Sequence, residues 1–511
     1  MKLYLIILSI ETLLQQAHSV LDASKDDSLV FKFFPNTFIW LQSLAPLLGQ
    51  LHNPSLGVMR PFAGAVFLVR QSSVDRAPRL SRDINGYSVA LRMAIYSASL
   101  VSKHADRLPQ DTLTEIIYLI SITAELATDQ LDVLTENKLF ASTLDPDAVA
   151  GVREFASTGI QKCFSNIIPG AKEWREGFGA GNQNKFSAVV HGLVSKLVQA
   201  SAGTTSIAFY SARVLSHLLS NLVEEHGWQN TAGEDWLSKL DILKTSTTNI
   251  FGAIAILTGL QDTLRTSKSV NNLCNRLISD AAGASAQSEK TLGMLVLLNS
   301  CLAVYDEDDL PVAQNRLVFA VKQILSWTES LATDNYLSSE VCRALQILLP
   351  AIKSVYGSYW ETSLAFCVAI WKSSENASSL DRRLAVIGMS LKLFSNLQNL
   401  QDVNDDLEDA LTKYGESLSE GLIALLKLPR PKITQPLDFV DDLLSRQVRK
   451  IPLSHIKDLE EFYPLVASDV LTIQSAAFDV LHRAIPAQQE QISLDVLLEK
   501  KGMLGIFYFS D

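Results

Sequence analysis

Closely spaced glycines at residues 177–182 are the first candidate for a chemical site, because glycine-rich loops can cradle phosphate groups. Gly177, Gly179 and Gly181 alternate with other residues in this segment. A nucleotide-binding loop also needs a preceding strand, and the nucleotide-hydrolase type ends in Gly-Lys-Ser or Gly-Lys-Thr. The segment has neither feature. We therefore interpret it as a loop between helices.

Two acidic runs, residues 306–309 and 402–409, are candidates for calcium binding. A calcium loop requires alternating oxygen ligands, a glycine in the middle and a terminal glutamate at fixed offsets. Neither run has this pattern. We interpret both as solvated charge in loops or at helix ends.

Histidine and cysteine supply most zinc ligands and many general bases and nucleophiles. No histidine belongs to an H-E-x-x-H motif or lies beside paired cysteines, and no G-x-S-x-G motif supports a serine nucleophile. We expect no catalytic residue, no cofactor-binding residue and no metal ligand, and we expect the widely spaced cysteines to be reduced thiols in the core. The residues concerned are His18, His52, His104, His191, His217, His226, His455 and His482, and Cys163, Cys274, Cys301, Cys342 and Cys367.

The densest local basic cluster consists of four arginines, Arg70, Arg76, Arg79 and Arg82. One interpretation is a contact with phosphate, for example in ribosomal RNA. The other is a solvated loop whose charge Asp75 and Asp83 partly neutralise.

Length and composition favour a folded protein that divides into domains or builds an elongated array over one compact core. The chain has 511 residues, of which 47% are hydrophobic and 19% charged, and its net charge is −11. This composition is too apolar for disorder, and the length exceeds that of a single core. The negative charge argues against general binding of nucleic acid.

Helical periodicity dominates the chain. Residues 317–331, 345–356 and 418–426 each place apolar residues three or four positions apart, which produces one apolar stripe on a helix. Asp145 and Pro146 predict a helix start, and Thr112 with Glu115 predicts a capping box. Pro350 interrupts a periodic stretch and should kink that helix or open a new one.

Successive helix pairs occupy roughly 40 to 47 residues, which is the period of HEAT and armadillo repeats. One pair cannot bury its apolar stripe alone, so pairs must stack on each other. We predict an all-α, HEAT/armadillo-like α-solenoid of stacked antiparallel helix pairs. A compact protein of several bundles would have similar stripes.

Proline positions suggest how this array is divided. Residues 428–436 contain three prolines and predict a linker between an array at 1–427 and a terminal helical section at 437–501. A second possible break covers residues 72–85. Residues 502–511 form an atypical apolar tail, which we expect to reflect a truncation or a mispredicted gene.

The terminal section resembles the end of the helical-repeat region of the listerin family, in its fungal form. The resemblance is sharp from Glu460 to Lys501, including Glu-Glu-Phe-Tyr-Pro-Leu-Val at 460–466, Ile-Gln-Ser-Ala-Ala-Phe-Asp-Val-Leu-His-Arg at 473–483 and Ala-Ile-Pro-Ala-Gln-Gln-Glu-Gln-Ile-Ser at 484–493. It is diffuse elsewhere, with similar segments at 83–96 and 315–327.

This resemblance implies a RING-type E3 ubiquitin ligase of ribosome-associated quality control in the cytosol. Such proteins are HEAT-type arms that clamp large ribosomal subunits carrying stalled nascent chains, together with partner proteins. A C-terminal RWD domain and a zinc-binding RING recruit the ubiquitin-conjugating enzyme. No residue here matches the zinc ligands, so this chain would supply the spacer and docking surface, without a cofactor and inactive alone.

Two alternatives remain open from the sequence. The chain could be a stand-alone HEAT-repeat adaptor for transport or complex assembly, unrelated to ubiquitin. The apolar run at residues 3–10, followed by Ala17-His18-Ser19, has a weak likeness to a secretory signal, but Glu11 follows it at once. We favour an ordinary helix there, no transmembrane helix and a cytosolic protein.

Overall fold

The computed structural model describes residues 80–487 with gaps, and also Thr12 and Gln16. The gaps are 106–107, 137–145, 168–182, 202–205, 227–249, 261–263, 266, 287–288, 306–308, 335, 353–356, 375–379, 401–404, 429–435 and 469. Every regular element in the described residues is a helix, which confirms the all-α prediction. The apolar run at 3–10 and the tail at 502–511 lie outside the described residues.

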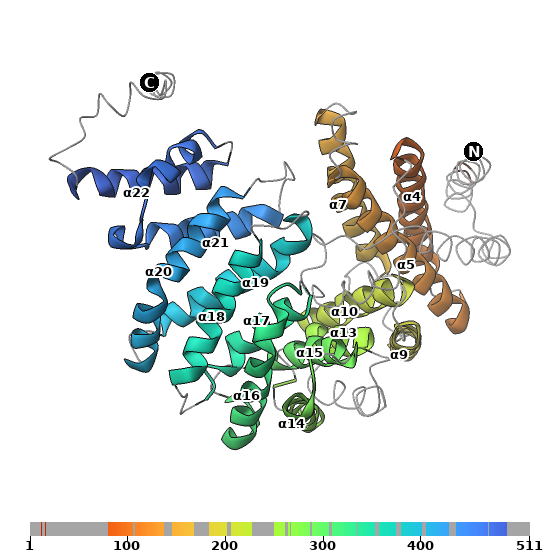
Figure 1. The fold of residues 1–511 in the computed structure, drawn as a ribbon. Coiled ribbons are helices and arrows are strands. Elements are labelled where there is room, and N and C mark those ends of the chain that lie inside the picture. Colours follow the sequence, from red (N-terminus) through yellow and green to blue (C-terminus); the bar gives the residue numbers. More distant parts are fainter. Residues whose placement is uncertain are drawn as a thin grey trace. The chain divides into compact units, whose positions relative to one another are not determined.

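The chain forms two compact units, Met1–Ile324 and Leu325–Asp511. The described helices of the first unit are α4 (Leu80–His104), α5 (Gln110–Glu136), α7 (Pro146–Ile167), α9 (Gln183–Ala200), α10 (Ser206–His226), α13 (Ile250–Gly259), α14 (Lys268–Gly283) and α15 (Glu289–Leu302). Helix α16 (Gln314–Leu331) crosses the boundary. In the first unit α4, α5 and α7 pack on one another, and α10 packs on α5, α9 and α13 (Figure 1).

The second unit contains six α-helices wholly within it and three short 3-10 helices among its described residues. Its elements are α17 (Tyr336–Leu348), α18 (Gly357–Ser374), α19 (Leu380–Asn399), α20 (Asp405–Lys427), α21 (Pro436–Arg449), the 3-10 helices η6 (Leu453–His455), η7 (Leu459–Phe462) and η8 (Pro464–Ala467), and α22 (Leu471–Ala487).

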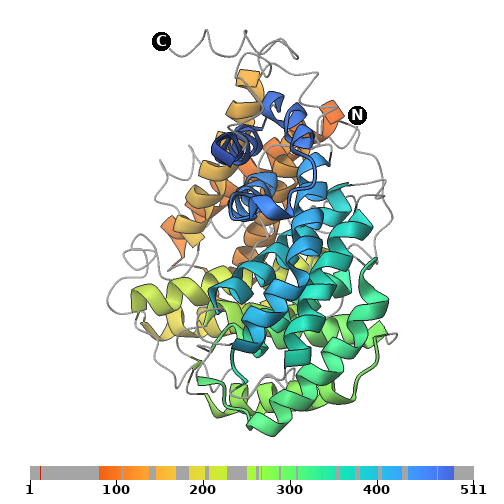
Figure 2. The ribbon, with the colours of Figure 1, turned by 60° about the vertical axis from the view of Figure 1, so that its left-hand side comes forward.

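Alternate helices of the second unit stack on each other, as in a HEAT array. Helix α17 packs on α19, α18 on α20 and α19 on α21, while α18 also packs on its neighbour α19 (Figures 1 and 2). Helices α16, α18 and α20 start at residues 314, 357 and 405, so pairs repeat after about 45 residues. This packing supports the predicted HEAT-like repeat.

The apolar stripes found in the sequence are the buried faces of these helices. In α16 the stripe is buried throughout, at Leu317, Val321, Ile324, Leu325, Thr328 and Leu331. In α20 the buried set includes Leu418, Leu422, Leu425 and Leu426. Each helix therefore contributes one face to a core shared with its neighbours.

Local start and stop signals were less reliable. Helix α7 begins at Pro146, as predicted. The capping box was wrong, because α5 already begins at Gln110 and Thr112 lies inside its first turn. Pro350 neither kinks a helix nor opens one. Helix α17 ends at Leu348, before the proline whose ring would clash with a continuing helix.

Two of the predicted domain boundaries can be compared with the bounds of the described helices. Residues 80–85 of the possible break at 72–85 belong to α4. Helix α20 ends at Lys427 and α21 begins at Pro436, and both belong to the second unit. The role of residues 428–436 as a linker stays a prediction.

Candidate functional site

Most residues of the basic cluster and the whole glycine-rich segment lie in parts of the chain that the structure does not describe. Arg70, Arg76, Arg79 and residues 177–182 lie outside the described residues. Arg82 lies in helix α4, so it does not belong to a loop as one interpretation required. Phosphate contact by these arginines stays a prediction.

The second acidic run forms a helix end. Asp405, Asp406, Glu408 and Asp409 are exposed in the first turns of α20. Negative charge there interacts favourably with the positive end of the helix dipole. Among the described residues no group of three or more His, Cys, Asp or Glu side chains is arranged to hold a metal ion.

All five cysteines are buried, free thiols, as predicted. The structure adds two spatial pairs that their sequence spacing concealed. Cys274 in α14 and Cys301 in α15 form the first pair. A hydrogen bond with Cys274, which is the larger cause, and burial both raise the pKa of Cys301. Cys342 in α17 and Cys367 in α18 form the second pair. Burial and the neighbouring Cys367 raise the pKa of Cys342. The thiols of Cys301 and Cys342 are therefore protonated and poorly nucleophilic.

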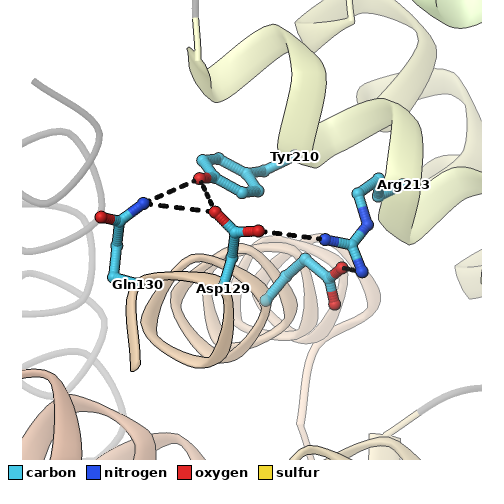
Figure 3. Close-up of polar contacts among 5 residues, drawn as sticks. Asp129, Gln130, Tyr210 and Arg213 are labelled. Atoms are coloured by element: carbon cyan, nitrogen blue, oxygen red, sulfur yellow. Dashed lines mark hydrogen bonds and ion pairs between the residues drawn. The ribbon is translucent and has the colours of Figure 1, made fainter. Parts of the chain in front are cut away.

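A buried polar cluster, which the sequence analysis missed, joins α5 to α10 in the first unit (Figure 3). Arg213 places Nη2 2.6 Å from Oε1 of Glu125 and Nη1 3.7 Å from Oδ1 of Asp129. The Tyr210 hydroxyl donates to Oδ2 of Asp129 at 2.6 Å. Gln130 donates through Nε2 to the same oxygen and to the Tyr210 hydroxyl, both at 3.2 Å.

The electrostatics of this α5–α10 cluster suit a structural role. Two carboxylates face one guanidinium, and all members are at most 5% exposed. Burial, followed by the charge of Asp129, raises the pKa of Tyr210 well above its usual value, so its hydroxyl remains a proton donor. Burial and the charge of Glu125 also raise the pKa of Cys163 in α7. Because these groups have no access to a substrate, we interpret the cluster as fixing α5 against α10.

A second buried arginine closes the ends of two helices. Arg383 in α19 is 5% exposed. Its Nη2 donates to the carbonyl oxygens of Ala332 and Ile370, both at 3.0 Å, and its Nη1 to that of Thr333 at 3.2 Å. Ala332 and Thr333 directly follow α16, where a helix leaves carbonyl groups unpaired, and Ile370 lies in the last turns of α18. Burial lowers the pKa of Arg383, against the opposing charge of Asp334.

The histidines do not assemble into a catalytic group in the described residues. His191, His217 and His482 are exposed on three different helices. His455 is partly buried in η6, where Nδ1 lies 3.4 Å from the Ser419 hydroxyl. His18 and His52 lie outside the described residues, as do the side chains of His104 and His226.

His455 borders a pocket of about 180 Å³ in the second unit. Residues from α19, α20, α21, η6 and the connection between α21 and η6 line it: Phe394, Gln398, Leu411, Gly415, Leu418, Ser419, Leu422, Gln447, Lys450, Ile451, Pro452 and His455. The lining mixes apolar with polar side chains, and Lys450 is its one permanently charged side chain.

The segment after α21 is held to α20 and α21 by surface ion pairs and by buried contacts. Lys427 pairs with Glu461 at 2.8 Å, Arg449 with Asp479 at 2.7 Å, and Lys457 with Glu420. Phe462 and Val466 from η7 and η8 are fully buried. The described part of the segment that resembles a known family, residues 460–487 apart from 469, therefore belongs to the packed second unit.

Two comparisons with known proteins agree with this arrangement. Residues 452–506 match the LTN1 family HEAT repeat region. The chain is 35% identical over 504 residues to E3 ubiquitin-protein ligase listerin of Neurospora crassa, which covers 97% of the chain and 31% of that protein. The chain thus spans about a third of the length of this relative.

None of the described helices is both long and apolar enough to span a membrane. The similarity extends along nearly the whole chain, and the family match begins at residue 452, where α21 gives way to the short helices. The chain is therefore a listerin-like helical region.

Proposed function

We propose that this chain is the scaffold arm of a listerin-like E3 ubiquitin-protein ligase that acts on nascent chains stalled on large ribosomal subunits. In this role the chain supplies the spacer and docking surface. Ubiquitin transfer itself belongs to a zinc-binding RING, which recruits the ubiquitin-conjugating enzyme.

The single observation that carries this proposal is the 35% identity to listerin, which extends over 97% of the chain. The architecture is compatible with it, because stacked helices act through shape and reach. The buried clusters around Arg213 and Arg383 join helices and have no exposed reactive group. A cytosolic location and contact with the large subunit are parts of the same proposal.

Arm length provides a direct test in a protein that contains this chain together with the ligase domains. Deletion of residues 357–404 removes one helix pair, α18 and α19, and should shorten the spacing between the ends. Ubiquitylation of a stalled nascent chain on purified large subunits should fall by about tenfold or more, because the reacting groups are misplaced. Self-ubiquitylation, which needs only the RING and the conjugating enzyme, should be unchanged.

The control variant is Gln161→Ala, an exposed position of α7, which leaves the length of the arm unchanged. Co-sedimentation with large subunits should be retained by this variant. A protein that never travels with large subunits would contradict the proposal and favour the stand-alone adaptor. The isolated chain should neither bind zinc nor stimulate ubiquitin transfer.

A further inference from the structure

The pocket bordered by His455 contains hydrogen-bond acceptors that the protein itself does not satisfy. The amide oxygens Oε1 of Gln398 and Gln447 are buried and have no hydrogen-bond partner among the described residues. Gln447 is only 2% exposed, and both side chains line the pocket. A buried acceptor without a partner costs free energy, so a ligand that donates a hydrogen bond gains from this site.

The rest of the lining defines what else the ligand must have. Phe394, Leu418, Leu422 and Ile451 give the pocket apolar walls. Such walls favour a flat apolar group over a small polar one. A volume of about 180 Å³ holds one large side chain and excludes a helix or strand of a partner.

The positive charge of Lys450 favours a ligand whose hydrogen-bond donor is neutral. Lys450 is exposed at the rim and is positively charged. A guanidinium or ammonium donor would be repelled by this ammonium group. A neutral N–H on an aromatic ring combines an apolar body with a group that only donates.

Gly415 helps to shape this pocket. A Cβ at this position would lie 2.8 Å from Cε1 of His455, so only glycine lets the imidazole approach α20. The imidazole is also held by its 3.4 Å contact with the Ser419 hydroxyl. The wall formed by η6, at the start of the listerin-like 452–506 segment, therefore depends on residues of α20.

We propose that this pocket binds the indole side chain of a tryptophan presented by a partner protein. The indole ring lies against the apolar walls, and its N–H donates to the amide oxygen of Gln447 or Gln398. This inference is independent of the proposed ligase function.

Two small probes of nearly the same shape test the inference on the full chain. Indole has the N–H group, and benzofuran replaces it with an oxygen that cannot donate. Binding of each probe is measured by ligand-observed NMR titration. Indole should bind about tenfold more tightly than benzofuran, which corresponds to one hydrogen bond to a buried acceptor.

Gln447→Met and Gln398→Met each keep the size of the side chain and remove one amide. Indole should lose its advantage in the variant whose amide oxygen accepts the N–H, while benzofuran binds as before. Circular dichroism checks that both variants fold. The matched control is Gln161→Met, an exposed position of the first unit, which should preserve the preference. Equal binding of the two probes, no binding of indole, or an unchanged preference in both pocket variants would overturn the inference and indicate a pocket filled by water.

Discussion

The indole ring of Trp371 in α18 lies directly against Gly421 in α20, so closely that a Cβ on that glycine would be 2.9 Å from Cε3 of the ring. Trp371 is fully buried, donates from Nε1 to the Ser390 hydroxyl at 2.9 Å, and meets Phe394 edge to face at 5.5 Å. The ring is therefore held on several sides and cannot move away from α20. The close contact between α18 and α20 is possible because glycine at position 421 has no side chain.

Gly421→Ala should lower the free energy of unfolding by about 1–2 kcal/mol, because the added methyl group overpacks the contact with Trp371. The matched control is Gly151→Ala in α7, where a Cβ meets nothing within 4 Å. That change should raise stability by about 0.5–1 kcal/mol, since alanine has the higher helix propensity. Urea unfolding monitored by circular dichroism measures both. A stabilising effect at Gly421 would contradict the close contact.

Arg213→Met should destabilise the first unit by about 3–5 kcal/mol, because it leaves the carboxylates of Glu125 and Asp129 buried without their cation. The exposed pair of Lys413 and Glu361, at 2.8 Å, provides the comparison. Lys413→Met should leave the urea midpoint unchanged, because water screens that pair. Similar losses in the two variants would show that the α5–α10 cluster is not buried as described.

Arg383→Lys should lower the stability of the second unit by about 2–4 kcal/mol, although the charge is kept. A lysine ammonium is a single point and cannot reach the carbonyl groups of Ala332, Thr333 and Ile370 together. Arg446→Lys is the matched control, since Arg446 is 67% exposed and makes only a surface pair with Asp442. Its effect should stay within about 0.5 kcal/mol. Thermal unfolding of the two variants side by side provides the measurement.

The buried thiols should resist a thiol reagent until the chain unfolds. Burial raises the pKa of Cys367 to about 12, so the reactive thiolate is scarce at neutral pH. Ellman's reagent at pH 8 should label none of the five cysteines rapidly in the native chain and all five in urea.

The same shift fixes the sign of a pH effect on stability. The folded-state pKa of Cys367 lies above its ordinary value of 9.0, so the unfolded chain loses this proton first. This contribution to stability is complete below about pH 9 and is lost as the pH rises toward 12. Urea midpoints measured between pH 8 and pH 10 should therefore decrease, and Cys367→Ala should reduce that decrease.

Repetition made the fold predictable from sequence. The stripe from Leu317 to Leu331 recurs with helical spacing, and every member of it is buried. Such a stripe depends only on neighbours along one helix, so a single sequence reveals it. The start of α5 was missed because Gln110 and Pro109 carry no strong capping side chain, whereas Thr112 and Glu115 imitate one.

Contacts between distant residues could not be predicted in this way. Asp129 and Tyr210 lie 81 positions apart, and no local pattern indicates that their helices meet. The neighbouring thiols of Cys274 and Cys301 were hidden for the same reason. The pocket lined by Gln398 and Gln447 required four elements to come together. Helical periodicity shows which face of a helix is buried but not which helix covers it.

The pairing of Arg213 with Glu125 and Asp129 also determines how the first unit gives way under mechanical load. Sliding α5 along α10 by even one turn would pull the guanidinium from both carboxylates at once and strand three charges where no water reaches. Contacts between apolar side chains alone would allow the two helices to slide gradually. Under a pulling force this part of the chain therefore resists extension until the buried ion pairs break together.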